Sequence, residues 1–350
     1  MKTPLKGTST SEGTNVSRLA GFGQQYGFIL VLLVVVIYFS FAAPFFFSFD
    51  NLLAVLHATA PMLVIATGLA VVVFAGKIDI SLGSVAFLAA VIGMKLHYEF
   101  GVPSQISLVI MVFIGLALGA VNGAIIVGLR INSLVTTLAT MIAFRGLALT
   151  LTGSQSIALP EEIRVLGNAK VGPIFIDIII AILALLLMSG VMKNTSFGRQ
   201  IMAIGNDEDT AERIGINVRH KTFVAFVISG GLAGLGGALA MVQVGSITSF
   251  LGQGLEFTAV AVVVIGGISL YGGAGSILPG VLLGAVTLEV VRNGLNQIGA
   301  DPYLYQIITG IVIFVAIYAF SLQRFRLKSK TTRETKEDYS ASKTVTGPTP

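Results

Sequence analysis

The longest charged stretch between the apolar segments of this chain is KNTSFGRQIMAIGNDEDTAERIGINVRHK, residues 193–221. Segments apolar enough to cross a bilayer precede and follow it. The stretch is too short to form a domain, and its alternation of apolar and charged residues is unlike that of a flexible linker. It predicts a short helix held at the membrane surface, where a soluble partner can push on it.

The composition around this stretch is that of a membrane protein. The chain is 54% hydrophobic and only 11% charged, with a mean hydropathy of +0.89. Apolar segments of spanning length lie at about 26–47, 51–75, 80–97, 106–129, 132–152, 173–192, 222–244, 256–271, 276–296 and 303–322. Backbone groups in lipid must be hydrogen-bonded internally, so we expect an all-α, polytopic bundle of about ten transmembrane helices with a cytoplasmic coupling helix. The 80–97 and 256–271 segments are short, and a re-entrant or broken helix at either would lower that number.

Several classes of function are disfavoured by what the sequence lacks. Cysteine is absent, so no disulfide, thiol nucleophile or cysteine metal site can form. The three histidines are scattered and make no ligand cluster. The net charge of +5 comes from basic residues at helix ends, with no folded soluble region to carry them, so no nucleic acid is expected as a partner. We expect no catalytic residue, metal or cofactor.

The distribution of lysine and arginine predicts the orientation. Basic residues gather on the side that holds both termini, residues 193–221 and the run after Phe320, and this side is therefore cytoplasmic. The loop 153–171 is then extracytoplasmic. We expect a disordered tail at 1–22, a transmembrane permease domain at 23–325 and a second tail at 326–350 in a bacterial inner membrane. Because its apolar run is long and Pro44 follows, the first span is an uncleaved helix rather than a signal peptide.

Two parts of the chain resemble each other. Residues 70–84 read AVVVFAGKIDISLGS, and residues 261–276 read AVVVIGGISLYGGAGS. Each is an apolar run that ends in a glycine-rich break and continues into a new helix. Transporters built from repeated halves carry such broken helices at corresponding places near the pathway.

Four ordered motifs carry a family resemblance. They are GKIDISLGS at 76–84, VTTLATMIAFRGLALTLTG at 135–153, FGRQIMAIGN at 197–206 followed by GINV at 215–218, and the glycine-rich block within 255–284. Together they resemble the permease subunits of bacterial sugar ABC importers of the ribose, xylose and autoinducer-2 type, in the branched-chain amino acid/sugar permease superfamily. The chain departs from that pattern at Lys77, where the family commonly has glycine, and at residues 207–212, where relatives often carry a Glu-Ala-Ala-like sequence.

The resemblance implies a membrane subunit without ATPase activity of its own, and the sequence contains no Walker motif. The implied partners are one or more cytoplasmic ATP-binding subunits, an extracytoplasmic solute-binding protein, a second permease copy or a related permease, and membrane lipid. The implied cargo is a simple sugar or sugar-like solute.

The charged stretch supplies the expected contact with the ATPase. Gly205 and Gly215 bracket a length of chain suited to one short helix, and acidic residues stand at its expected start, where they complement the helix dipole. The alternative is a solvated charged loop. The coupling candidates are Gly205, Asn206, Asp207, Glu208, Asp209, Ala211 and Gly215.

Polar residues within the apolar segments are candidates for the solute path or its gate. Asp79 and Ser81 follow the first glycine break, where Asp79 either only caps the next helix or also gates the path. Asn122 lies among small residues, which favours helix packing. The hydroxyls of Thr136, Thr137 and Thr140 either bond to their own helix or line a wet path.

Arg145 and Glu289 are the charges that fall clearly inside predicted spans. A charge at that depth is costly unless it faces protein or water, so each should have a partner. We predict that Arg145 and Glu289 pair or share one polar path. The alternatives for Arg145 are helix-end carbonyls as its partners, or a contact with solute.

Two other classes of protein are alternatives to an ATP-driven permease. An ion-driven secondary transporter needs titratable groups at mid-membrane, for which Glu289 and Asp177 are the candidates. An intramembrane enzyme needs a paired nucleophile and base, and no such pairing is visible.

Overall fold

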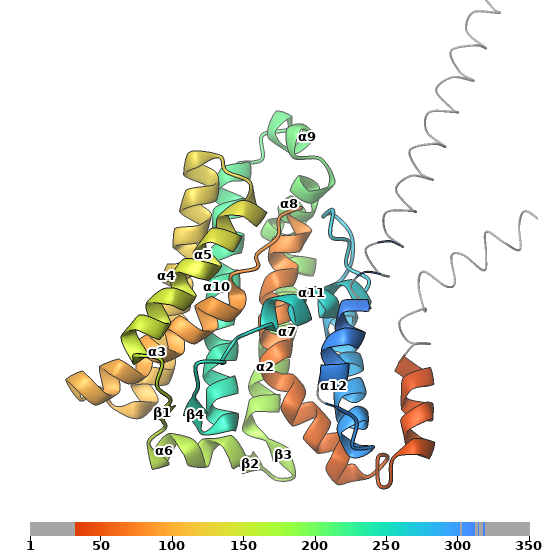
Figure 1. The fold of residues 1–350 in the computed structure, drawn as a ribbon. Coiled ribbons are helices and arrows are strands. Elements are labelled where there is room, and N and C mark those ends of the chain that lie inside the picture. Colours follow the sequence, from red (N-terminus) through yellow and green to blue (C-terminus); the bar gives the residue numbers. More distant parts are fainter. Residues whose placement is uncertain (1–31, 302, 312–313, 315–317, 319–350) are drawn as a thin grey trace, which may run out of the picture.

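The computed structural model describes residues 32–301, 303–311, 314 and 318. The described residues form a bundle of long helices with a few two-residue strands (Figure 1). The predicted tails at 1–22 and 326–350 lie outside them, as do parts of the first and last predicted spans.

The helices and strands follow the glycine and proline punctuation of the sequence. In chain order, a helix at Leu32–Ala42 is followed by α2 (Phe49–Phe74), α3 (Leu82–Phe100), α4 (Ser104–Leu129), α5 (Ser133–Thr152), β1 (Ile157–Ala158), α6 (Glu161–Arg164), η1 (Val165–Asn168), β2 (Lys170–Val171), β3 (Ile174–Phe175), α7 (Ile176–Asn194), α8 (Ser196–Asn206), α9 (Glu208–Arg213), α10 (Val218–Val244), β4 (Ser246–Ile247), α11 (Leu255–Ile265), η2 (Ile277–Val281) and α12 (Leu282–Gln297). Strand β1 pairs with β4, and β2 pairs with β3, both antiparallel.

Helices α2 and α10 form the centre of the bundle. Residues 63–74 of α2 are buried without interruption, as expected of a helix that protein surrounds on all sides. Helix α10 packs against α4 through facing glycines, and a Cβ atom at Gly230 would lie 2.7 Å from the Cα of Gly119. The two backbones therefore approach closely because neither helix carries side chains there.

The two ends of the bundle differ. Figure 1 shows α8 and α9 at one end, and α6 with the β2–β3 hairpin at the opposite end. The predicted cytoplasmic stretch 193–221 and the predicted extracytoplasmic loop 153–171 thus lie at opposite ends of the long helices, as a membrane between them requires.

The described residues contain six helices long and apolar enough to cross a membrane, by length and composition. They are α2, α4, α5, α7, α10 and the segment Ile277–Gln297 formed by η2 and α12. Two further apolar helices, Leu32–Ala42 and α11, are shorter. The fold is that of a mostly helical multi-pass membrane protein, and the number of about ten spans stays a prediction.

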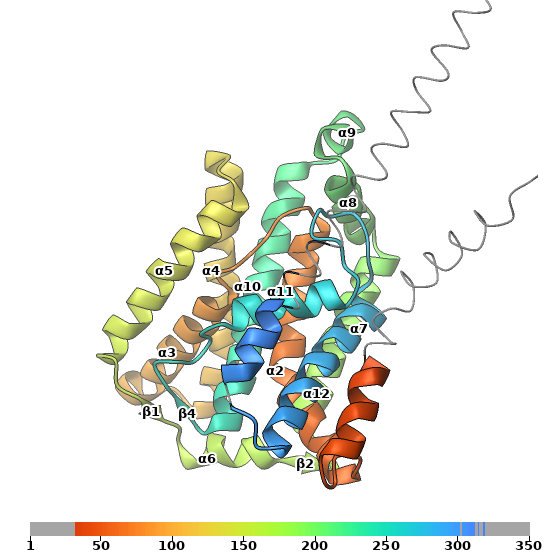
Figure 2. The same ribbon diagram turned by 45° about the vertical axis from the view of Figure 1, so that its right-hand side comes forward.

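Helices α5 and α11 have unusual positions. Figure 2 shows α5 at the margin of the bundle and the short α11 lying across the long helices about halfway between the two ends. The second glycine-rich break explains the short α11, because the helix stops at Ile265 and an irregular segment, 266–276, follows.

Candidate solute path and coupling surface

The first glycine break interrupts the bundle between α2 and α3. Helix α2 ends at Phe74, Gly76 adopts a φ of +69°, and the chain has no regular structure again until Leu82. We call residues 75–81 the first break. Its second half is buried: Asp79 is 1% exposed and Ser81 fully buried.

Side chains of α5 satisfy the backbone of the first break. The N–H of Ile78 donates to Ser133 Oγ, and the N–H of Ile80 donates to Thr137 Oγ1, both at 3.2 Å. The Thr137 hydroxyl lies 3.4 Å from the carbonyl oxygen of Ile78. An irregular backbone inside a membrane bundle needs such partners, and here a neighbouring helix provides them.

Asp79 lies at the centre of a buried hydrogen-bonded cluster. Its Oδ1 accepts from the backbone N–H of Ser81 at 3.0 Å and from the Ser81 hydroxyl at 2.6 Å. Its Oδ2 accepts from Ser229 Oγ of α10 at 3.2 Å. The amide of Asn122 on α4 donates to Ser81 Oγ at 2.7 Å. The cluster therefore ties the start of α3 to α4 and α10.

The three candidate threonines, Thr136, Thr137 and Thr140, all face the protein. Thr136, Thr137 and Thr140 are at most 8% exposed. Thr140 donates to the carbonyl of Thr137 in its own helix, whereas the hydroxyl of Thr136 is buried and has no partner among the described residues. Of the three, Thr137 bonds to the first break in this conformation, and whether any of them contacts solute stays a prediction.

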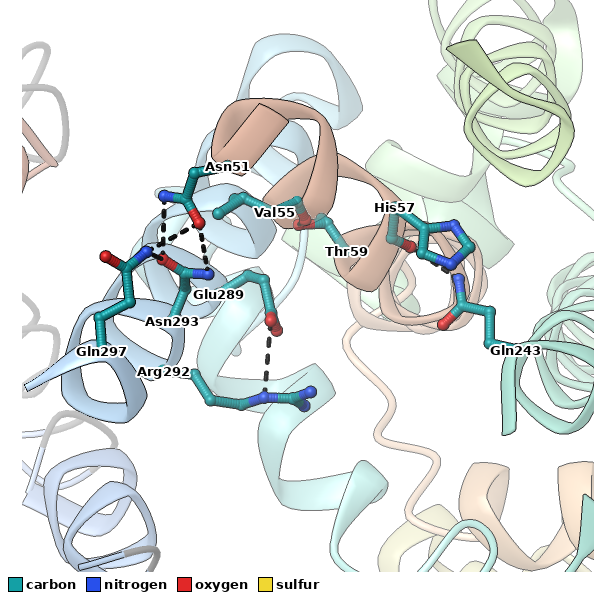
Figure 3. Close-up of polar contacts among 9 residues, drawn as sticks. All are labelled: Asn51, Val55, His57, Thr59, Gln243, Glu289, Arg292, Asn293 and Gln297. Carbon is teal, nitrogen blue, oxygen red and sulfur yellow. Dashed lines mark hydrogen bonds and ion pairs between the residues drawn. The ribbon is translucent and has the colours of Figure 1, made fainter. Parts of the chain in front are cut away.

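The predicted pairing of Arg145 with Glu289 is wrong. Glu289 forms an ion pair with Arg292, three residues along α12, with 3.5 Å between Oε1 and Nε (Figure 3). Arg145 donates from Nη2 to the carbonyl of Leu251 at 3.3 Å and interacts electrostatically with Glu256. Glu289 is thus paired with Arg292, its i,i+3 neighbour on the same helix, and not with a residue on another helix.

An amide cluster beside Glu289 was missed at the sequence level. Asn51, Asn293 and Gln297 bond to one another at 2.8–3.1 Å and join the first turn of α2 to the last turns of α12 (Figure 3). The spacing of Asn293 and Gln297, four apart in an apolar segment, was the available signal, because such residues share one helix face.

Asp177 belongs to a polar group near the end of the bundle that carries α6. Its Oδ2 lies 2.8 Å from Nδ1 of His57. Gln243 of α10 donates to Asp177 and also to the backbone carbonyl of His57, the latter at 2.7 Å (Figure 3). Asp177 is thus held by two other helices in this conformation.

At the opposite end, the charged stretch forms two short helices rather than the single one that we predicted. The coupling candidates Gly205, Asn206, Asp207, Glu208, Asp209, Ala211 and Gly215 run from the last turn of α8 through α9 to the turn after it. Asp207 ends α8 and caps α9, accepting from the N–H of Thr210 at 2.8 Å. Hydrogen bonds from Thr210, first of all from its backbone, hold the pKa of Asp207 below its ordinary value, so the cap is charged at neutral pH. Ala211 is buried, whereas Asp209 is exposed.

Three glycines join α8 to both breaks. The Cα atoms of Gly76 and Gly205 would lie 2.7 Å and 2.8 Å from a Cβ added at Gly272. A Cβ at Gly205 would overlap the carbonyl oxygen of Phe74, the last residue of α2. The N–H of Gly273 donates to that same carbonyl at 3.0 Å. We call Gly76, Gly205 and Gly272 the glycine junction.

An ion pair runs alongside the junction. Lys77 Nζ of the first break lies 2.7 Å from Glu208 Oε2 of α9. Both residues lie where the chain departs from the pattern of the permeases it resembles. They line a polar cavity of about 570 Å³ at this end of the bundle, together with Arg130 and Arg219.

The arrangement of these helices and breaks defines the class of membrane protein. Apolar helices of spanning length surround two broken helices, buried polar groups satisfy the first break, and a pair of surface helices contacts both breaks at one end. This is the architecture of a multi-pass membrane permease.

The comparisons with known proteins identify the family. Residues 51–317 match the family described as "Branched-chain amino acid transport system / permease component". The autoinducer 2 import system permease protein LsrC of Photorhabdus luminescens is 34% identical over 277 residues, 78% of this chain and 82% of that protein. The ribose import permease protein RbsC of Escherichia coli K12 is 30% identical over 299 residues, 83% of this chain and 91% of that protein.

A third relative, the probable ABC transporter permease protein YphD of Escherichia coli K12, is 32% identical over 299 residues, 84% of this chain and 89% of that protein. The chain belongs to this permease family. It is a membrane permease subunit of an ATP-binding-cassette importer.

Proposed function

We propose that this subunit forms the translocation path for a simple sugar or sugar-like solute, and that a cytoplasmic ATPase drives it by acting on α8 and α9. The observation that supports this most is the glycine junction. It places α8 in backbone contact with the end of α2 and with the second break, residues 266–276. A displacement of α8 is therefore transmitted to both broken helices through backbone contacts rather than through flexible side chains.

The proposed movement follows from this contact. The backbone contacts leave no room for α8 to shift unless the first and second breaks shift with it. The first break in turn holds the Asp79 cluster, which joins α3, α4 and α10. Rocking of these helices would alternate access to the path between the two sides of the membrane.

The proposed transporter contains subunits on both sides of the membrane. ATP is bound and hydrolysed by separate cytoplasmic subunits, because the chain has no Walker motif. An extracytoplasmic binding protein delivers the solute, and a second permease copy or a related permease completes the path. In this proposal the chain crosses a bacterial membrane about ten times and both termini lie in the cytoplasm. Helices α8 and α9 then lie on the same side as the ATPase. The printed names of the relatives, for ribose and autoinducer 2, support a small polyhydroxylated solute.

The polar groups inside the bundle favour ATP over an ion gradient. Asp79 accepts three hydrogen bonds, Asp177 contacts His57 and Gln243, and Glu289 pairs with Arg292. Each of these three carboxylates has protein partners in this conformation, so an ion would have to compete with them.

The test compares two energy sources. The permease is expressed with its ATPase and binding protein, and uptake is measured for D-ribose, D-xylose and autoinducer 2. We expect uptake to continue when ionophores collapse the proton and sodium gradients, and to stop when ATP is depleted. Uptake that follows the ion gradient and survives ATP depletion would instead establish a secondary transporter.

A further inference from the structure

Arg145 is the charge on α5, and it forms no ion pair with the residues that the structure describes. Its side chain is partly buried, and its guanidinium carbon lies 5.5 Å from the centre of the Phe87 ring. One nitrogen, Nη2, donates to the carbonyl of Leu251. A guanidinium has five N–H donors, and the other contacts of Arg145 in the described part of the chain are not hydrogen bonds.

Glu256 stands opposite, in the first turn of α11. It is 7% exposed, and its Oε2 is buried without a hydrogen-bond partner among the described residues. A buried carboxylate oxygen without a hydrogen bond costs free energy. Such oxygens are found where a ligand or a water molecule supplies the missing hydrogen bond.

A glycine on α3 provides the space for this carboxylate. A Cβ atom at Gly83 would lie 2.6 Å from Glu256 Oε2. The side chain of any other residue there would therefore fill the volume beside the unused oxygen. Gly83, in the family motif at the start of α3, thus leaves room both for the backbone carbonyl of Gly252, which the same Cβ would overlap, and for Glu256.

The two charges attract each other without touching. Each contributes an electrostatic interaction to the other, yet no nitrogen of Arg145 comes within the 4.0 Å of Glu256 that defines an ion pair. The site therefore combines unused donors of Arg145 with an unused oxygen of Glu256.

We propose that Arg145 and Glu256 bind a hydroxyl group of the solute as it passes through the permease. A hydroxyl is the neutral group that fits, because it donates to Glu256 and accepts from Arg145 at once. Helix α11 lies about midway between the ends of the bundle and α5 at its margin, where a path shared with a second permease would run (Figure 2). The inference rests on the proposed function and adds the place of solute contact.

The first experiment measures coupling. The complete transporter is reconstituted in proteoliposomes, and the probe is whichever of D-ribose, D-xylose and autoinducer 2 the wild type accumulates. We expect Glu256→Gln and Arg145→Gln each to lower the solute moved per ATP hydrolysed about tenfold, the effect of one charged hydrogen bond. The amount of assembled transporter is measured for each variant, and the solute moved is expressed per assembled transporter as well as per ATP hydrolysed. Wild-type coupling in both variants would overturn the inference.

The second experiment uses the absence of native cysteine. Glu256→Cys is treated with an impermeant methanethiosulfonate during turnover, and Ala261→Cys, fully buried in the same helix, is the matched control. We expect position 256 to react and the solute to slow the reaction, with no reaction at 261. Failure of position 256 to react, or reaction without protection by solute, would leave only a structural or water-bridged pair and overturn the inference. A wild type that accumulates none of the three solutes with ATP would overturn the proposed function instead.

Discussion

The two glycine-rich breaks have similar sequences but are stabilised in different ways. In the first break, residues 75–81, the N–H groups of Ile78 and Ile80 donate to side chains of another helix, those of Ser133 and Thr137. In the second break, residues 266–276, the N–H of Ser269 donates to the carbonyl of Ala274 at 3.1 Å, so the centre of this segment is closed by a bond within the segment itself.

The difference separates two mechanical roles. The conformation of the first break depends on α4, α5 and α10, so moving any of these helices alters it. The second break forms its own turn, and residues 274–276 are exposed, so it can move as a unit. The two breaks meet at the glycine junction, where α8 contacts both.

Filling the junction should have the largest effect. We expect Gly205→Val to abolish uptake and to reduce the folded amount, because its Cβ would overlap the Phe74 carbonyl and overpacking costs about 1–3 kcal/mol or more. The control is Gly190→Val on α7, which meets open space. Uptake assays with quantified membrane abundance check this, and wild-type uptake in the Gly205 variant would break the link between α8 and the breaks.

Removing the carboxylate of the first break, that of Asp79, should have the second-largest effect. Asp79→Ala leaves the donors of Ser81 and Ser229 unpaired, a cost of about 1–3 kcal/mol for a buried group. Ser269→Ala in the second break should cost much less, because only the N–H of Tyr271 donates to that hydroxyl. Thermal unfolding in detergent measures both, and equal losses would remove the distinction between the breaks.

A smaller effect is expected from one hydroxyl of α5. Thr137→Val keeps the shape but leaves the N–H of Ile80 without its acceptor, at a cost of about 1 kcal/mol. Thr150→Val is the control, because that exposed hydroxyl bonds only to Gly146 in its own helix. Should the two variants unfold at the same temperature, α5 would not support the first break.

The smallest effect is expected from the ion pair between Lys77 and Glu208. Both side chains are partly exposed, so their coupling energy should be about 0.2–1 kcal/mol and should fall as salt is added. A double-mutant cycle with Lys77→Met and Glu208→Gln measures it. A coupling energy of zero at low salt would show that this ion pair does not hold α9 to the first break.

Much of the architecture could be predicted from the sequence. Apolar runs predicted the long helices, and the recurrence of glycine, isoleucine, serine and leucine predicted the break at Gly76 and the short helix that ends at Ile265. These features are local, because glycine and segment length act on the nearby backbone. The placement of the 193–221 stretch opposite the 153–171 loop also followed, from charge alone.

The polar partners could not be predicted, because they depend on which helices become neighbours. Glu256 stands at the edge of a predicted span and therefore did not count as an intramembrane charge. Only the crosswise position of α11 brings it near Arg145. In the same way, the serine acceptor for Ile78 and the serine donor to Asp79 come from distant helices, α5 and α10. No spacing within the sequence reveals such contacts.

Cross-linking from the two ends of the bundle tests the central claim most directly, which is that ATP-driven motion enters at α8 and α9. The chain has no cysteine, so single thiols can be placed at Asp209 on α9 and at Asn168 on η1, both exposed and at opposite ends. In the assembled transporter, Asp209→Cys should capture the ATPase, identified by mass spectrometry, and Asn168→Cys should not. Capture of the ATPase from Asn168→Cys, or of the extracytoplasmic binding protein from Asp209→Cys, would contradict the account.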